Sequence, residues 1–169
     1  MSWSRATAAL LALCLPLLAS CGFHLRGMQQ LPFDTIALTF PPNSSLGILL
    51  TRNIRAGTNT KVITEVTKAA AVLEVISEIQ DRAVLTLDSQ GRAIEYTLFD
   101  HLRIRLRDDK GRELIEPTLL EVKRDISFND SQRLSKESEE ALLYRDMQAD
   151  LVQQIMRRLA AAKPYASAD

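Results

Sequence analysis

Cysteine and histidine are scarce in this chain of 169 residues, which contains two of each. Cys14 and Cys21 both lie near the N-terminus, so the rest of the chain has no thiol with which to form a disulfide. His24 and His101 are too far apart for the ligand spacing of a zinc site. The sequence therefore excludes a disulfide-stapled fold and a zinc motif, and we expect no metal and no cofactor.

An excess of charge of one sign is also absent, because 21 basic side chains balance 21 acidic ones. Bulk binding to nucleic acid is excluded on this ground. The chain also lacks the G-x-S-x-G and H-E-x-x-H motifs and any glycine loop that could cradle a phosphate. His101 has the pattern of a surface residue within a strand. We therefore expect a protein that is not an enzyme.

The N-terminus carries the pattern of a bacterial lipoprotein signal. The apolar run from Ala6 to Leu18 follows Arg5 and is shorter than the roughly 20 residues that span a bilayer. Leu18 then precedes two small residues and Cys21, as in a lipobox, where the thiol receives a diacylglycerol. We expect residues 1–20 to be removed and Cys21 to be the lipid attachment site.

Gly22 follows Cys21 where an aspartate would commonly signal retention in the inner membrane. A glycine at this position favours an outer-membrane location, in which the protein is anchored by lipid on the periplasmic side. Residues 21–30 would form the anchor and tether, 31–163 a single domain, and 164–169 a mobile tail. Loss of Arg5 with the signal would leave 20 basic and 21 acidic side chains.

The first part of the domain predicts a strand within residues 31–40, a helix from Leu46 that ends near Gly57, and a short strand over 61–67. A longer hairpin follows. Apolar residues occupy even positions from Ile94 to Leu106, which predicts a strand with one buried face. Turn signals flank this strand, at residues 89–92 and 109–112, and each has glycine in its third position.

A two-residue loop at Gln90-Gly91 predicts a specific register for this hairpin, in which paired positions sum to 181. The apolar pairs would be Leu85 with Tyr96, Ile79 with Leu102, and Val75 with Leu106. On the opposite face, the charged pairs would be Glu78 with Arg103, and Glu74 with Arg107.

A third strand over 113–128 changes phase near Pro117, which indicates a bulge or an edge position. Residues 135–162 predict a long helix, because Leu143, Met147 and Leu151 recur every four residues. Two helices can cover only one face of such a sheet. We therefore expect an α+β fold in two layers, with two helices packed on one face of a mostly antiparallel four-stranded sheet.

Loop cations are the candidate ligand-binding residues, because loops at the ends of strands often carry function. Arg92 and Arg112 lie at hairpin tips, and Arg133 and Lys136 lie where the chain enters the long helix. A strip of Arg103, Arg105 and Arg107 could also bind anionic head groups. Pairing of Arg103 and Arg107 with glutamates of the neighbouring strand is the favoured alternative for the strip.

The segment Cys21-Gly22-Phe23-His24-Leu25-Arg26-Gly27 resembles the start of the mature chain in the LptE family of lipopolysaccharide-assembly lipoproteins. The resemblance extends to the hairpin return at Gly91-Arg92-Ala93-Ile94 and to the closing helix around Tyr144-Arg145. It implies two helices on a four-stranded sheet. It also implies a lipoprotein seated in the lumen of the β-barrel LptD, whose assembly it supports.

The resemblance further implies that the protein binds lipopolysaccharide and helps to deliver it to the outer leaflet. Lipopolysaccharide carries phosphates, so the resemblance places this role on the loop cations Arg92 and Lys136, with Arg133 beside Lys136. The sequence leaves one alternative open. The protein could be a stand-alone outer-membrane lipoprotein that binds a small apolar ligand between its sheet and its helices.

Overall fold

The computed structural model describes residues 30–129 and 132–163. The expected signal segment, the lipid site Cys21, His24 and the expected tail at 164–169 lie outside these residues. The elements, in chain order, are β1 (Thr35–Leu38), α2 (Ser45–Gly57), β2 (Lys61–Ile63), a 3-10 turn (Val66–Lys68), β3 (Ala71–Leu87), β4 (Ala93–Asp108), β5 (Glu113–Ser127) and α3 (Arg133–Ala161).

The strands form one mixed sheet of five strands in the order β2-β1-β3-β4-β5. The predicted α+β class with two helices is confirmed, but the predicted count of four strands is wrong. The short β2 joins the sheet because α2 provides the crossover that lets it pair with β1 in parallel. β1 is also parallel to β3, while β3, β4 and β5 form an antiparallel meander.

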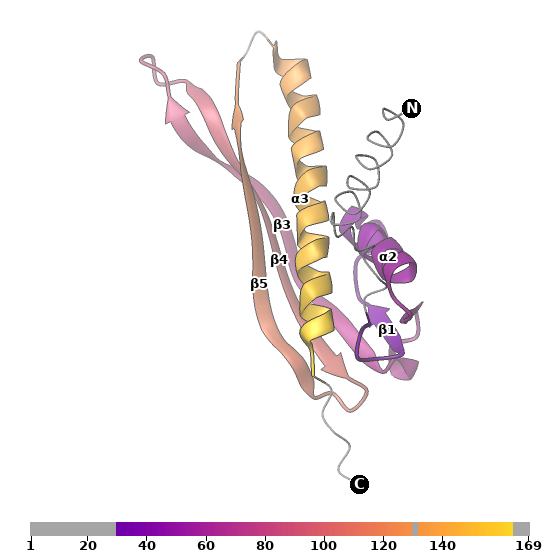
Figure 1. Cartoon of the computed structure of the whole chain (residues 1–169). Helices are drawn as coiled ribbons and strands as arrows, with labels where there is room; N and C mark the ends of the chain where they lie inside the picture. Colours follow the sequence, from indigo (N-terminus) through magenta and orange to yellow (C-terminus); the bar gives the residue numbers. More distant parts are fainter. Residues whose placement is uncertain (1–29, 130–131, 164–169) are drawn as a thin grey trace, which may run out of the picture.

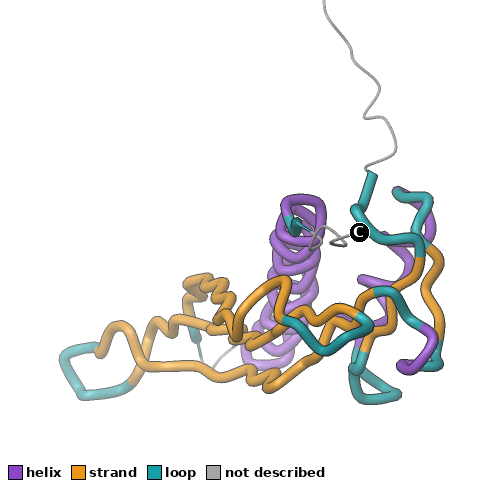
Figure 2. Tube along the Cα trace, turned by 90° about the horizontal axis from the view of Figure 1, so that it is seen from below, coloured by secondary structure: helices purple, strands orange, loops and turns teal. Residues whose placement is uncertain are grey.

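The two helices pack on the sheet and enclose a continuous apolar core. α3 runs along the long strands and α2 lies beside β1 (Figure 1). Seen from below, α3 lies on one side of the strands (Figure 2). Each fully buried aliphatic side chain contributes about 1.5–3 kcal/mol to this packing. The fully buried side chains include Leu46, Leu50, Ile54, Leu98, Leu102, Ile104, Leu106, Met147 and Leu151.

The predicted register between β3 and β4 is wrong, because the loop that joins them has three residues and because β3 contains bulges. Leu73 faces Leu106, and beyond the irregularity between Val75 and Ser77 the pairing shifts so that Glu78 faces Leu102. A bulge inserts one unpaired residue and exchanges the faces of all residues beyond it. Ile79, which the predicted register places in the core, is consequently 53% exposed.

The long edge strand β5 behaves as its sequence predicts. Its pairing with β4 shifts between Ile104, which faces Thr118, and Leu106, which faces Ile115. Pro117 lies within this shift, at the edge of the sheet where a missing N–H is tolerated. The predicted bulge or edge position is therefore confirmed.

Candidate functional site

The hairpin tip between β3 and β4 is built around the Asp88 carboxylate. Its Oδ1 accepts hydrogen bonds from the backbone N–H groups of Gln90 and Arg92, at 2.8 and 2.9 Å. Its Oδ2 accepts from Nε of Arg92 at 2.8 Å. The Arg92 backbone N–H, the Gln90 N–H and the guanidinium together hold the pKa of Asp88 below its usual value.

The turn is one residue longer than the sequence predicts. The backbone N–H of Asp88 donates to the Arg92 carbonyl at 2.8 Å, so residues 89–91 form a three-residue loop. Gly91 has φ of 78°, as such a loop requires in its left-handed position. The turn at Asp108 and Arg112 repeats this geometry, with φ of 79° at Gly111.

The candidate cations occupy different environments on the molecule. Arg92 projects at the tip of the β3–β4 hairpin, which diverges from α3 towards its end (Figure 1). Its side chain is 65% exposed although it pairs with Asp88, so further donors of the guanidinium face solvent. Arg112 lies at the opposite end of the meander.

Lys136 lies in the first turns of α3, where its Nζ donates to Ser127 Oγ at 3.1 Å and to Glu139 at 2.8 Å. Its side chain is only 14% exposed, so it contributes to the docking of α3 on the end of β5. Arg133 is the first residue of α3, and its side chain is not among those that the structure describes.

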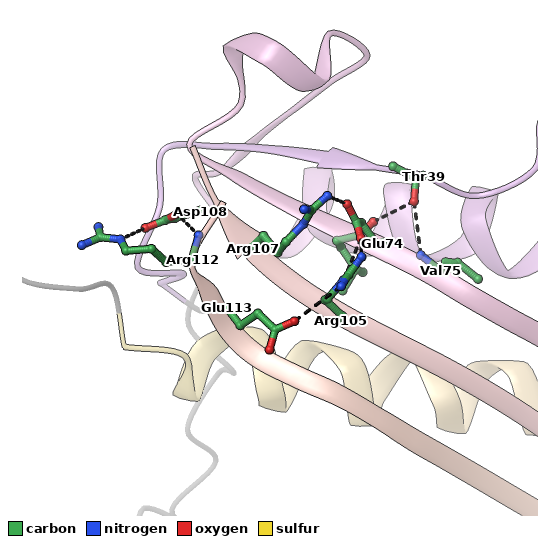
Figure 3. Close-up of polar contacts among 9 residues, drawn as sticks. Thr39, Glu74, Val75, Arg105, Arg107, Asp108, Arg112 and Glu113 are labelled. Atoms are coloured by element: carbon green, nitrogen blue, oxygen red, sulfur yellow. Dashed lines mark hydrogen bonds and ion pairs between the residues drawn. The ribbon is translucent and has the colours of Figure 1, made fainter. Parts of the chain in front are cut away.

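Two arginines of the strip on β4, Arg105 and Arg107, share the Glu74 carboxylate of β3 (Figure 3). Arg105 Nε donates to Glu74 Oε2 at 2.8 Å, and Arg107 contacts the other oxygen of the same carboxylate. The expected ion pair of Arg107 with Glu74 is confirmed, although the residue directly opposite Glu74 in the register is Arg105 and not Arg107 as predicted. The predicted pair of Glu78 with Arg103 is wrong, because the bulge places Glu78 on the helix-covered face.

Glu78, which is half-buried, belongs to a group of polar residues on the helix-covered face that sequence reasoning missed. Its carboxylate accepts from the hydroxyl of Ser44, the N-cap residue of α2, at 3.1 Å. Asp100 is fully buried opposite Gln80, which donates to its Oδ2 at 3.0 Å, while its Oδ1 has no hydrogen-bond partner among the described residues. Burial raises the pKa of both carboxyl groups.

His101 is a surface histidine that has interaction partners, as its position within the alternating strand predicts. Its ring stacks on Phe99 with centroids 5.5 Å apart, and its Nδ1 lies 3.3 Å from Glu121. In the part of the chain that the structure describes, no group of three or more potential ligands could hold a metal ion. No helix in the same part is long and apolar enough to cross a membrane.

These features define the class of the protein. It is a two-layer α+β domain whose polar groups gather at hairpin tips and on the sheet. Residues 33–159 match the family model described as LptE, lipopolysaccharide-assembly. The chain belongs to the LptE family.

Individual relatives agree with this assignment. The chain is 28% identical to the LPS-assembly lipoprotein LptE of Pectobacterium atrosepticum, over 88% of this chain and 82% of that one. The solution structure of lipoprotein B from Nitrosomonas europaea is 35% identical, covers 83% of this chain and 91% of that one, and gives a TM-score of 0.72. Rare lipoprotein B from Shewanella oneidensis shares the fold, with a TM-score of 0.66 at 22% identity over 76% of this chain and 95% of that one.

Proposed function

We propose that this protein is the outer-membrane lipoprotein of a lipopolysaccharide-assembly complex and that it sits in the lumen of an LptD-type barrel. The observation that carries the proposal is the family match over almost the whole folded domain. Relatives named LPS-assembly lipoprotein LptE, in Pectobacterium, Photorhabdus and Yersinia, support it. The role is binding and assembly rather than catalysis.

The sheet face that the helices leave uncovered carries the polar side chains expected of a surface that lies inside a barrel. Arg103, Lys123 and Glu121 lie on it with His101, and the first three are exposed. A barrel lumen is lined by polar side chains and water. A photo-crosslinking residue at position 103 or 123 should therefore give a covalent adduct with the barrel in cells. Adducts from α3 alone, with none from either sheet position, would contradict this orientation.

Lipidation at Cys21 is part of the same proposal. The chain should incorporate labelled palmitate, and Cys21→Ala should abolish the incorporation. Because several acyl chains hold a protein on a membrane far more stably than one, variant chain that is not bound to a barrel should leave the membrane fraction.

We assign binding of lipopolysaccharide to Arg92 and Lys136, with Arg133 nearby. Charge-assisted hydrogen bonds from arginine and lysine are the usual means of holding phosphate. Arg92→Ala combined with Lys136→Ala should weaken lipopolysaccharide binding about tenfold or more, and circular dichroism shows whether loss of the Lys136 contacts leaves the fold intact. Arg112→Ala, in the matching turn at the other end, is the control. Equal binding by the double variant and the control would contradict the assignment.

The alternative, a small apolar ligand held between the sheet and the helices, has less support. That space is packed with buried side chains from the sheet and from both helices, among them Leu50, Leu102 and Leu151. Co-purification with a barrel, described at the end of the Discussion, separates the two possibilities.

A further inference from the structure

A hollow of about 660 Å³ lies beside α2, on the side of the helix that faces the loop after β1. Its volume is within the range of small-molecule sites. Apolar side chains form most of its wall, and Ile48 at its mouth is 54% exposed. The residues that line it include Phe40, Pro41, Ile48, Arg52 and Arg55.

The wall of the hollow is fixed by the approach of Phe40 to α2. A Cβ at Gly47 would lie 2.7 Å from Phe40 Cβ and 2.8 Å from its Cγ, so only glycine allows this packing. Ser44 caps the helix by accepting from the Gly47 N–H at 3.0 Å. One wall of the hollow is therefore formed by Phe40 packed closely against the capped start of α2.

Two arginines supply the charge of the hollow. Arg52 and Arg55 are exposed and lie three residues apart on α2, so their side chains are neighbours on the helix surface. Among residues 30–129 and 132–163, neither guanidinium has a hydrogen-bond or ion-pair partner, and no carboxylate lines the hollow. Arg92 and Arg105, in contrast, are each paired with a carboxylate.

We propose that this hollow binds one anionic glycerophospholipid. An acyl chain would lie against Phe40, Pro41 and Ile48, and the phosphate would be held by Arg52 and Arg55 together. A single apolar hollow with one pair of guanidinium groups matches one phosphate and one or two chains. Lipid A carries two phosphates and several chains, and fits this site less well. The proposal is independent of the lipopolysaccharide site at Arg92.

The test uses the lipidated full chain, purified from membranes in a neutral maltoside detergent and titrated with dioctanoyl phosphatidylglycerol under native mass spectrometry. The wild-type chain should take up one equivalent. Arg52→Gln combined with Arg55→Gln should weaken binding about tenfold or more, since two charge-assisted hydrogen-bonding groups are lost. Ile48→Asp should weaken binding comparably by placing a charge at the apolar mouth.

Arg157→Gln combined with Arg158→Gln, near the end of α3, is the matched control and should bind as the wild type does. Thermal unfolding of each variant shows whether the substitutions leave the fold intact. Undiminished binding by the Arg52/Arg55 variant would overturn the proposal. Uptake of lipopolysaccharide but not of phosphatidylglycerol would overturn the assignment to a phospholipid.

Discussion

The Asp88 carboxylate binds both the backbone and the side chain of Arg92: it accepts hydrogen bonds from the Arg92 N–H at 2.9 Å and from Nε at 2.8 Å. The acid thereby fixes the direction of the hairpin tip and of the cation that the tip presents. Because its pKa is lowered, Asp88 stays ionised at pH values at which an ordinary aspartate becomes protonated. The tip is therefore a preorganised element rather than a loose loop.

Asp88→Ala should loosen this tip without unfolding the sheet. The amides of Gln90 and Arg92 lose their acceptor, so their hydrogen exchange should accelerate by about fivefold, as expected for a bond of about 1 kcal/mol. Asp109→Ala is the control, because the Asp109 side chain accepts no hydrogen bond among the described residues. Exchange at Gln90 and Arg92 that is equal in the two variants would show that the carboxylate does not order the turn.

Gly47→Ala should destabilise the domain, because its Cβ would clash with Phe40 at 2.7 Å. Overpacking of this kind costs about 1–3 kcal/mol of the free energy of unfolding, measurable by urea denaturation. Gly57→Ala, at the end of the same helix, would place its Cβ in open space with no atom within 4 Å, and should be neutral or slightly stabilising. The opposite order of the two variants would contradict the close approach of Phe40.

Asp100→Asn should stabilise the domain at neutral pH. Burial raises the pKa of Asp100 above 3.8, so the folded chain binds this proton more tightly than the unfolded chain. The resulting stabilisation is complete below pH 3.8 and is lost as the pH rises through the raised pKa. At pH 7 the variant should be more stable than the wild type, because a neutral amide replaces a buried ionised carboxylate.

The gain from Asp100→Asn should shrink towards zero as the pH falls towards 3.8, where the wild-type carboxyl is protonated. Denaturant titrations over this pH range measure it. Asp146→Asn, at an exposed position of α3, is the control and should change stability little at any pH. A gain that does not depend on pH would mean that ionisation of Asp100 is not its cause.

Glu74→Gln should destabilise the meander, because one carboxylate serves both Arg105 and Arg107 (Figure 3). The Glu74 side chain is 17% exposed, so the loss should be about 1–2 kcal/mol, above that of an exposed pair. Glu113→Gln removes only the 3.5 Å contact to Arg105 and should cost less than about 0.5 kcal/mol. Equal losses would show that Glu74 has no special role.

The sequence predicts the elements of this fold better than it predicts their pairing. The even-numbered apolar residues of β4 mark its buried face correctly, because strand periodicity is a local property. The bulge after Val75, in contrast, depends on tertiary contacts, because it brings Glu78 to Ser44 and Gln80 to Asp100. No local pattern in the sequence of β3 predicts it. The parallel pairing of β1 likewise depends on where α2 places the chain.

The candidate site shows the same division. Repeated glycine turns locate Arg92 and Arg112 at hairpin tips from sequence alone. Their partners, Asp88 and Asp108, stand beside the same turn signals, but the bonds to the arginines follow only from the three-residue loop geometry. Lys136 has the sequence pattern of a loop cation, and its contacts with Ser127 and Glu139 form only once α3 is docked.

The most direct test of the proposed function is co-purification. The full chain, with Cys21 and a C-terminal tag, is expressed in its own outer membrane, extracted in mild detergent, and the retained proteins are identified and quantified. We predict one stoichiometric, heat-modifiable barrel of LptD type, bound to wild-type chain and retained by the Arg92/Lys136 variant. Recovery of the lipoprotein alone, from membranes that contain the barrel, would contradict the account.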